Sequence, residues 1–478
     1  MIPARLQPVL DEVRPLADAF TSAGQPLYLV GGIVRDQLLG RELSAASDID
    51  LTTPAHPSQI KSILAPLADA MWTQGERFGT IGAKIAGRAF EITTHRAESY
   101  APDSRKPEVA FGDNITDDLA RRDFTVNAMA LSVPSHELID PFGGAADLAA
   151  GRLRTPRSPE ASFTDDPLRM LRAARFLAGY QLEPDPALID AVRANAHRLE
   201  IVSAERIRDE LDKLLVVPDP SAGLWFVVDT GLADHFLPEL PAMRLEQDPV
   251  HHHKDVLAHT IAVVAKTNQT RLVVDPDSGE SRTEPNRIVR LAALLHDVGK
   301  PKTRSFGEGG VAFHHHEVVG ARMARDRMQA LKYSNDDVEA VRQLVYLHLR
   351  FHTYKMGWTD AAVRRFVRDA GPWLDELIEL TRCDCTTRNQ RKAATLSRRM
   401  DELEERVAVL REQEAVDAIR PDLDGRQVMD HLAIGPGRHI GDALDHLLEV
   451  RLDEGPLGEE EAYRRLDAWW ASQRQASE

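Results

Sequence analysis

The chain has 478 residues, of which 43% are hydrophobic and 28% are charged, and its formal net charge is −16. This length suggests about three domains, and the composition is that of a soluble globular protein. The excess of acidic groups argues against broad, nonspecific binding to nucleic acid, although local basic patches still decide individual contacts.

The sequence carries no sign of a membrane or export segment. No apolar run approaches the length of a membrane-spanning helix, about 18 residues or more, and residues 1–15 lack the apolar core of a signal peptide. The two cysteines, Cys383 and Cys385, are too close for an unstrained disulfide. We therefore expect a cytoplasmic protein without a membrane partner.

The first elements suggest a phosphate site. We expect an amphipathic helix over residues 3–20 and a short buried strand over residues 27–30. Gly31 and Gly32 follow this strand and precede the helix-like residues 33–39. Two glycines let the backbone approach a ligand closely, and the N–H groups at a helix start favour negative charge.

Two aspartates then begin a second β-prone run. Asp48 and Asp50 are two residues apart, so in a strand their side chains point to the same face. Paired carboxylates suit Mg²⁺, which takes one or two of them together with phosphate oxygens. Either motif alone is more often an ordinary turn or a surface pair. Together, with Arg35 and Asp36 between them, they indicate phosphoryl or nucleotidyl transfer.

Residues 28–53 resemble the signature of the tRNA nucleotidyltransferase and poly(A) polymerase family, in its bacterial-type class II branch. The resemblance implies a multidomain protein of the α/β plus α class. Its expected parts are a nucleotidyltransferase head with a small mixed sheet, a helical neck that selects the nucleotide base, an all-α HD domain, and a helical linker with an RNA-binding tail. The expected boundaries are residues 1–155, 156–245, 246–395 and 396–478.

Further strands are expected in the head. Residues 57–68 predict a helix, and residues 80–86 and 89–94 predict a hairpin that turns at Gly87. Glu91 in the second strand is a candidate third acid beside the metal. A strand glutamate in an unknown register is more often simply exposed.

A polar stretch without periodicity, residues 95–109, predicts a mobile loop. In the family, a flexible loop here carries an arginine–proline element that accompanies the switch from adding C to adding A. Arg105, Lys106 and Pro107 resemble that element, with lysine in place of a second arginine. This favours a complete CCA-adding enzyme over one that adds only CC.

Residues 118–130 match a second family motif. Arg121 and Arg122 offer planar guanidinium groups for triphosphate oxygens, and Asp123 and Asn127 are expected four residues apart on one helical face. The resemblance assigns Arg122, Asp123 and Asn127 to the phosphates and ribose of the nucleotide. A surface salt-bridge cluster is the alternative.

The neck begins with a ridge of charged residues at every third position of an expected helix, namely Asp166, Arg169, Arg172 and Arg175. Cytosine and adenine both present an amino donor beside a ring-nitrogen acceptor, which a carboxylate and an arginine complement. Uracil and guanine present the opposite pattern. The resemblance implies that Asp166 and Arg169 select the base and that the other two arginines also contact the nucleotide. Simple ion pairs along the helix are the alternative.

The third region has a different chemistry, because histidines and aspartates recur in the order of the HD phosphohydrolases. The resemblance makes His259, His296, Asp297 and Asp384 metal ligands, with His316 and His348 as auxiliary residues. Such ligands suit Mn, Fe, Ni, Co or Zn more than Mg. Any one of these histidines alone is more often a core or surface residue.

The resemblance implies a CCA tRNA nucleotidyltransferase that adds C, C and A to the tRNA 3′ end from CTP and ATP, with Mg²⁺ at the catalytic residues Asp48 and Asp50. Gly31, Gly32, Arg35 and Asp36 are expected to bind the nucleotide, and the tRNA acceptor stem and elbow are the expected RNA contacts. A poly(A) polymerase and a CC-only or A-only enzyme remain alternatives. So does an HD phosphohydrolase with a vestigial head, and the HD site is a candidate for a secondary activity. The oligomeric state is left open.

Overall fold

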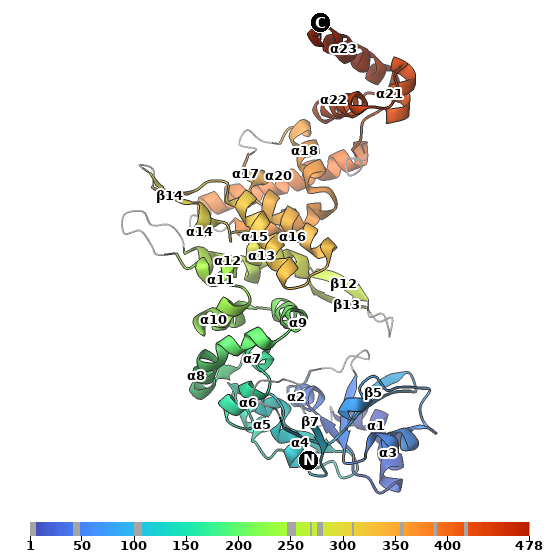
Figure 1. Ribbon diagram of the computed structural model, residues 1–478, viewed down its shortest axis with the longest axis vertical. Helices are drawn as coiled ribbons and strands as arrows, with labels where there is room; N and C mark the ends of the chain where they lie inside the picture. The colour runs from blue at the N-terminus through green and yellow to red at the C-terminus, as the bar shows by residue number, and fades with distance from the viewer. Residues whose placement is uncertain are drawn as a thin grey trace. The chain divides into compact units, whose positions relative to one another are not determined.

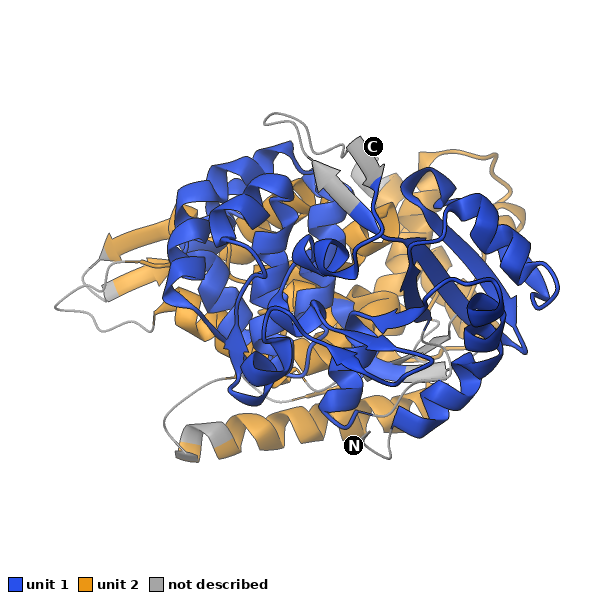
Figure 2. Cartoon of the chain, turned by 90° about the horizontal axis from the view of Figure 1, so that it is seen from below, with its two compact units in different colours: residues 1–242, 270–287, 330–333 blue, residues 243–269, 288–329, 334–478 orange. Residues whose placement is uncertain are grey.

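The computed structural model describes residues 6–41, 48–99, 108–245, 255–267, 270–274, 281–307, 310–353, 358–385, 390–414 and 419–477. The chain forms two compact units, coloured separately in Figure 2. The first unit comprises residues 1–242, 270–287 and 330–333, and the second comprises residues 243–269, 288–329 and 334–478. The boundaries of the four expected parts stay predictions.

The first unit is built on a seven-stranded mixed sheet with the strand order β3-β4-β5-β2-β1-β8-β9. Strands β2 and β5 run parallel, and the other neighbouring pairs run antiparallel. The mixed sheet expected for the head is confirmed. Its strands are β1 Tyr28–Val30, β2 Ile49–Thr53, β3 Ala70–Trp72, β4 Thr80–Ile85, β5 Arg88–Thr94, β8 Ala130–Ser132 and β9 Leu138–Ile139.

The helices α1 (Gln7–Ser22) and α3 (Pro57–Leu64) share a hydrophobic core with one face of this sheet, to which Ile33 and Val34 also contribute. Figure 1 shows α1 and α3 near β5 of the sheet. Phe20 of α1 packs in one cluster with Ile49 of β2 and Phe90 of β5, and all three are almost fully buried. Since successive strand residues point to opposite faces, the residues that flank Ile49 project from the other face. That other face is where the acidic side chains lie.

The hairpin expected around Gly87 is confirmed, but the loop expected over residues 95–109 is wrong where the structure describes it. Strands β6 (Arg96–Ser99) and β7 (Glu108–Phe111) form a second antiparallel hairpin. The polar composition concealed these strands, because pairing with a partner strand can outweigh the intrinsic β-propensity of a segment. Arg105, Lys106 and Pro107 lie outside the described residues.

Helices complete the first unit. They are α2 Gly32–Leu38, α4 Ile115–Ala120, α5 Gly144–Ala149, α6 Pro159–Asp165, α7 Leu168–Tyr180, α8 Pro186–Asn195, α9 Ala204–Leu215, α10 Ser221–Asp229 and α11 Glu239–Ala242, with the 3₁₀ turns η2 Glu76–Phe78, η3 Thr125–Asn127, η4 Ala196–Ile201 and η5 Leu232–His235. Two short strand pairs, β10 Arg152–Leu153 with β11 Glu183–Pro184 and β12 Thr270–Val274 with β13 Ser281–Pro285, also belong to it.

Two helix predictions in this unit are wrong in detail. The expected continuous helix through Asp166 is broken into α6 and α7, and Asp166 is extended, with φ −142° and ψ 101°. Pro167 explains the break, because proline disfavours the helical conformation of the residue before it. Asp123 and Asn127 do not share an α-helix either, since only the short turn η3 forms there.

The second unit is mostly helical, with one short antiparallel hairpin, β14 (Arg304–Gly307) with β15 (Gly310–Phe313). Its helices are α12 Val256–Lys266, α13 Arg287–Leu295, which begins at the unit boundary, α14 Lys300–Thr303, α15 His316–Ala330, α16 Asn335–Leu347, α17 Arg350–Thr353, α18 Asp360–Ala370, η6 Gly371–Trp373, α19 Leu374–Asp384, α20 Gln390–Glu414, α21 Gly425–Leu432, α22 Arg438–Glu454 and α23 Glu459–Ser477. The last three helices share a small core of their own, which includes Val428, Leu447 and Leu466. Among the helices described, none has both the length and the apolar content to cross a membrane.

Candidate functional site

Three carboxylates gather on the open face of the sheet in the first unit. Asp50 of β2 and Glu91 of β5 are Cα partners across a parallel strand pair, so their side chains project from the same face. Asp48 and Asp50 are exposed, whereas Ile49 between them is buried. The expectation that the two aspartates share a face is confirmed. The register of β2 with β5, which could not be predicted from the sequence, places Glu91 beside the two aspartates.

These carboxylates disturb one another electrostatically. Loss of hydration raises the pKa of Asp50, Arg122 opposes the shift, and Asp48 adds to it. Loss of hydration likewise raises the pKa of Glu91, and the charges of Asp50 and Asp48 raise it further. A divalent cation bound among these groups would relieve the repulsion. The all-oxygen donor set fits Mg²⁺.

The glycine turn lies beside this acidic group. Gly31 has φ +73° and ψ −133°, a conformation that side chains rarely adopt, and a Cβ there would lie 2.9 Å from Nη1 of Arg122. Gly31 therefore allows the guanidinium of Arg122 to approach the start of α2. Gly32 is the first residue of that helix.

A buried carboxylate orients the arginine pair. Asp118 is fully buried and accepts hydrogen bonds from Arg121 at 2.8 and 3.0 Å, from Arg122 at 3.4 Å and from the backbone N–H of Arg96 at 3.2 Å. Burial alone would raise the pKa of Asp118, but Arg122 and Arg121 lower it. Sequence reasoning included Asp118 in the motif without giving it a role. An acid three and four residues before two arginines was the available signal.

The other motif residues form one hydrogen-bonded network. Arg35 donates to Asn127 Oδ1 at 2.6 Å, and Asn127 donates to Asp123 Oδ1 at 2.9 Å. Arg172 of α7 donates to Asp123 Oδ2 at 2.6 and 2.9 Å. Arg35 also donates to both oxygens of Asp36, at 2.8 and 2.9 Å. Burial opposes the charge on Asp123, yet Arg172 and Asn127 lower the pKa of Asp123. The network joins α2, η3 and α7.

Asp166 and Arg169 are not paired with each other. Asp166 accepts from Arg206 at 2.8 Å and from the backbone N–H of Leu168 at 3.1 Å. Arg169 is buried, donates to Ser162 Oγ at 2.9 Å and also donates to the backbone carbonyl of Arg121. That second bond ties α7 to the arginine pair beside the acids. Arg206, which sequence reasoning left without a role, holds Asp166.

The charged residues expected to form one ridge on α7 contact different partners. Arg172 faces Asp123, whereas Arg175 pairs with the buried Glu210 of α9. Arg172 lies 3.9 Å from the same Glu210. Among the described residues these two arginines form no ion pairs along their own helix, which was the alternative interpretation, because their acidic partners belong to other elements.

A second cluster, in the second unit, gathers the expected HD residues from five segments. His259 Nε2 lies 2.9 Å from Asp384 and 3.6 Å from Asp297. His296 Nε2 lies 3.2 Å from Asp297, and His316 Nε2 lies 3.4 Å from the other oxygen of Asp297. The rings of His296 and His348 are 5.3 Å apart, as are those of His316 and His348. Asp297 is therefore the centre of the cluster.

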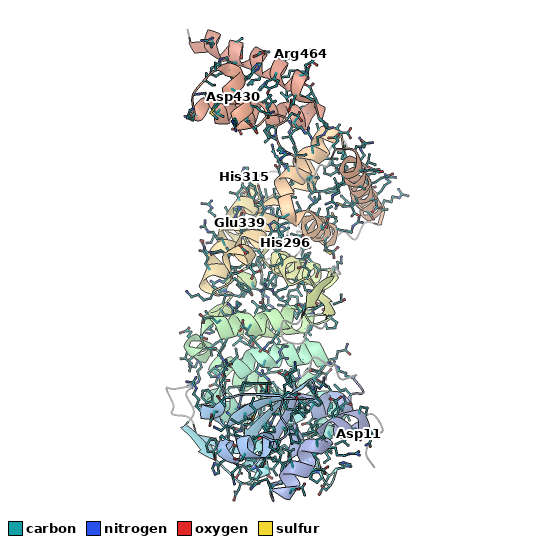
Figure 3. All side chains as sticks on the ribbon, turned by 90° about the vertical axis from the view of Figure 1, so that its right-hand side faces the viewer. Asp11, His296, His315, Glu339, Asp430 and Arg464 are labelled. Carbon is teal, nitrogen blue, oxygen red and sulfur yellow. The ribbon has the colours of Figure 1, made fainter. Side chains whose placement is uncertain are left out.

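The imidazoles are held with one nitrogen toward that centre. Nδ1 of His296, His316 and His348 donates to a backbone carbonyl three residues earlier, at 2.8, 2.8 and 2.6 Å. Their Nε2 atoms and Oδ1 of Asp297 are buried and make no well-aligned hydrogen bond. His296 is completely buried, whereas His315, also labelled in Figure 3, has 83% of its side chain exposed.

This donor set fits a metal. Backbone bonds at Nδ1 fix the tautomer in which Nε2 carries a free lone pair, as in metal-bound histidines. Burial, reinforced by His296, lowers the pKa of His348 to about 3, which favours its neutral form. Histidine nitrogens with carboxylate oxygens suit transition metals. His316 and His348, expected only as auxiliary residues, lie in the same cluster as the others.

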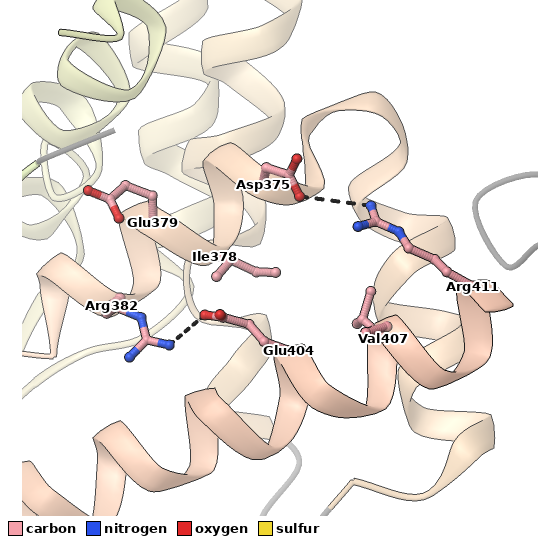
Figure 4. A pocket seen from close by; sticks show the side chains of 8 residues that line it. Asp375, Ile378, Glu379, Arg382, Glu404, Val407 and Arg411 are labelled. Atoms are coloured by element: carbon pink, nitrogen blue, oxygen red, sulfur yellow. Dashed lines mark hydrogen bonds and ion pairs between the residues drawn. The ribbon is translucent and has the colours of Figure 1, made fainter. Parts of the chain in front are cut away.

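A cavity in the second unit lies apart from the residues of both clusters. A cavity of about 390 Å³ lies between α19 and α20, and Figure 4 shows its charged lining. Arg382 pairs with Asp401 at 3.0 Å and with Glu404 at 2.5 Å, and Arg411 lies 3.8 Å from Asp375. The ion pairs of Arg382 therefore link α19 with α20.

A mixed sheet with three carboxylates, an arginine pair and a glycine turn defines a nucleotidyltransferase, here followed in the chain by an HD-type cluster of histidines and aspartates. Family models match at residues 27–154 (Poly A polymerase head domain), 181–243 (Probable RNA and SrmB- binding site of polymerase A) and 256–409 (HD domain). The chain is 34% identical over 460 residues to an A-adding tRNA nucleotidyltransferase of Deinococcus radiodurans, covering 94% of this chain and 96% of the relative. The chain belongs to the tRNA nucleotidyltransferase and poly(A) polymerase family.

Other relatives match over part or all of the chain. A CCA-adding enzyme of Lactobacillus johnsonii is 38% identical over 240 residues, which cover 50% of this chain and 57% of the relative. The Bacillus stearothermophilus CCA-adding enzyme in complex with CTP has the same fold, with a TM-score of 0.68, 22% identity and coverage of 99% of this chain and 100% of that one. The Thermotoga maritima CCA-adding enzyme complexed with tRNA has a TM-score of 0.59, 20% identity and coverage of 98% and 96%.

Proposed function

We propose that this enzyme transfers a nucleotide from CTP or ATP to the 3′ hydroxyl of tRNA and thereby adds the CCA end. The observation that carries the proposal is the group of Asp48, Asp50 and Glu91 on one face of the sheet, next to Arg122. Family membership supplies the reaction class. The relatives named above are CCA-adding or A-adding enzymes.

In this proposal the acidic group is the catalytic centre. Asp48 and Asp50 would hold magnesium, which when bound activates the attacking hydroxyl and stabilises the departing pyrophosphate. Glu91 is the third acid, and its position beside Asp50 supports this role. The exposure of the two aspartates leaves them accessible to substrate.

The nucleotide would lie between the glycine turn and the network. Arg122, held by Asp118, is placed to bind triphosphate oxygens near Gly31 and Gly32. The proposal assigns the phosphates and ribose also to Arg35, Asp36, Asp123 and Asn127, which share the hydrogen-bonded network.

Base selection is assigned to Asp166 and Arg169. A carboxylate that accepts from an amino group and an arginine that donates to a ring nitrogen admit cytosine and adenine and leave uracil and guanine unpaired. For this, Asp166 must share its oxygens between Arg206 and the base, and Arg169 must release one of its present acceptors. Arg172 supports the ribose side through Asp123, and Arg175 remains a proposed further nucleotide contact.

A second candidate function is addition of A alone. It is favoured by one observation, that the relative matched over nearly the full chain is an A-adding enzyme, whereas the Lactobacillus johnsonii CCA-adding relative is matched over half of the chain. Incubation of the purified protein with tRNAs that end before the first C, after the first C or after the second C, each with single nucleotides, separates the two. CTP incorporation on the shorter tRNAs supports CCA addition, and incorporation of ATP alone on the CC-ended tRNA supports A addition. Extension of any RNA with ATP would indicate a poly(A) polymerase.

A secondary phosphohydrolase activity is proposed for the HD cluster. His259, His296, Asp297 and Asp384 would hold a transition metal, and His316 and His348 face the same space. Turnover of bis-p-nitrophenyl phosphate with Ni²⁺ or Mn²⁺ tests it, and a lack of turnover with every transition metal counts against it. We also expect, as proposals, a cytoplasmic location and contact of the tail with the tRNA elbow.

A further inference from the structure

A tryptophan lies in the same row of the sheet as the catalytic acids. Trp72 of the edge strand β3 is the Cα partner of Gly82 in β4, Gly82 is the partner of Glu91 in β5, and Glu91 is the partner of Asp50 in β2. Cα partners in neighbouring strands send their side chains to the same face. Trp72 therefore projects from the acidic face, two strands beyond Glu91.

Gly82 makes room for the indole. A Cβ built on Gly82 would lie 1.9 Å from Nε1 and 2.0 Å from Cε2 of Trp72. The indole thus occupies the space above β4 and reaches toward Glu91. It is 36% exposed, and within the described residues its ring makes no aromatic, cation–π or hydrogen-bonding contact. An indole held in this way presents a free aromatic surface to solvent.

The two flanks of Asp50 differ. On the β1 side lie Gly31 and Arg122, to which the proposed function assigns the triphosphate. On the opposite side lie β5, β4 and β3, and thus Trp72. In nucleotidyl transfer the attacking and leaving oxygens are roughly in line across the reacting phosphorus. The hydroxyl of the RNA therefore has to approach from the flank that carries Trp72.

We propose that Trp72 is a positioning residue against which the base of the 3′-terminal nucleotide of the RNA stacks. The inference rests on the proposed function and deepens it, because it assigns the primer side of the same centre. Gly82 lies two strand spacings from β2, about 10 Å, a distance that a single nucleoside can span. Stacking on an aromatic ring tolerates every base, as a terminus that changes with each addition requires.

A structural role for Trp72 makes different predictions. If Trp72 only covered the edge strand, its replacement would lower the stability of the protein, and the effect on activity would not depend on the base at the RNA 3′ end. Met71 offers a matched control, since it is 43% exposed on the same strand but pairs with Ala83, which belongs to the core face. Met71→Ala removes exposed apolar surface from β3 without touching the acidic face.

The test uses the full-length protein with ATP and two RNAs, a tRNA that ends in CC and the same tRNA with an abasic ribose at its 3′ end. We expect Trp72→Ala to raise KM for the intact tRNA and to lower kcat/KM about tenfold, with an unchanged KM for ATP. For the wild-type protein, the abasic end should lower kcat/KM by a similar factor. For Trp72→Ala, the abasic end should cause no further decrease in kcat/KM. Trp72→Phe should restore most of the activity, and Met71→Ala should behave as wild type with both RNAs.

Gly82→Ala provides a second variant, because its Cβ displaces the indole without removing it. It should reproduce the loss seen with Trp72→Ala while thermal melting shows a folded protein. The inference would be overturned if the abasic end lowered kcat/KM by the same factor in Trp72→Ala as in wild type, so that the two effects were independent. Wild-type kinetics of Trp72→Ala would also overturn it. If Asp50→Ala still abolishes transfer in those cases, only this inference fails. If Asp50→Ala retains transfer, the proposed function itself fails.

Discussion

Asp50 and Glu91 occupy partner positions on the parallel strands β2 and β5. Loss of hydration raises the pKa of both carboxyl groups, and the charge of Asp50 raises the pKa of Glu91 further. The two residues are 41 positions apart in sequence, yet the sheet brings their carboxylates to one face. The relationship supports one acidic centre made of Asp48, Asp50 and Glu91. Several experiments test that centre and its surroundings.

Replacement of Asp50 by alanine should abolish nucleotide transfer, with a loss of at least about 10³-fold in kcat, because a bound metal supplies several kcal/mol of charge stabilisation. Binding of tRNA in a gel-shift assay should persist. Asp18→Asn, an exposed acid on α1, should retain full activity. Transfer at wild-type rate by Asp50→Ala would refute the assignment.

Replacement of Asp166 by asparagine should relax the choice of base. An amide presents both a donor and an acceptor, so discrimination between CTP and UTP should fall by about 10- to 100-fold. The ratio of kcat/KM for the two nucleotides measures this. Asp165→Asn is the neighbouring control, since Asp165 pairs with Arg157 instead. Unchanged discrimination in Asp166→Asn would place base selection elsewhere.

Replacement of Gly31 by alanine should raise KM for the nucleotide, because the new Cβ would lie 2.9 Å from Nη1 of Arg122 and displace it. Gly24 also has a positive φ, +69°, but has no neighbour within 4 Å of such a Cβ. Gly24→Ala therefore carries the backbone strain without the displaced arginine. A comparison of the two variants in steady-state kinetics isolates the effect on Arg122, and equal KM values would contradict it.

Acid should destabilise the head through His95. Burial, with smaller effects of neighbouring charges, lowers the pKa of His95 from 6.5 to about 4 in the folded protein. The unfolded chain binds a proton near pH 6.5, so the contribution to stability is complete above that pH and is lost as the pH falls toward 4. The maximum loss is about 3 kcal/mol.

Hydrogen exchange of β2 and β5 between pH 7 and 4 checks this expectation. His95→Gln should flatten the dependence, because glutamine does not titrate. His197→Gln changes an exposed histidine of the same unit and should leave the dependence as in wild type. Equal slopes in wild type and His95→Gln would remove His95 as the cause.

Replacement of His296 by alanine should reduce the transition-metal content of the purified protein and leave nucleotide transfer intact. His296 Nε2 is buried beside Asp297 at 3.2 Å, whereas the acidic centre belongs to the other unit. Elemental analysis and the extension assay give the two readouts. His315→Ala, at an exposed neighbouring position, is the control. Loss of transfer in His296→Ala but not in His315→Ala would contradict the independence of the two clusters.

Local patterns predicted the parts of the site that depend on neighbouring residues. The two-residue spacing of Asp48 and Asp50 gave their common face, because strand geometry alone decides it. The break before α7 was not predicted, although Pro167 follows Asp166 directly and was the available local signal.

Relations between distant segments were beyond the sequence. The position of Glu91 beside Asp50 follows from the register of β2 with β5. The position of Trp72 follows from two further strand pairs, β5 with β4 and β4 with β3. The hairpin β6–β7 was missed because strand pairing outweighs composition. Arg206 and Asp118 gained roles only when their partners were seen across helices and turns.

Each of His296, His316 and His348 takes its Nδ1 partner from the carbonyl three positions earlier in its own segment. The orientation of these three imidazole rings is thus fixed by hydrogen bonds to nearby backbone and does not require a bound ion. If the cluster holds a metal as proposed, metal binding and folding are therefore separable: a chelator should remove the ion without melting the surrounding helices, and different metals should exchange into the same preformed site.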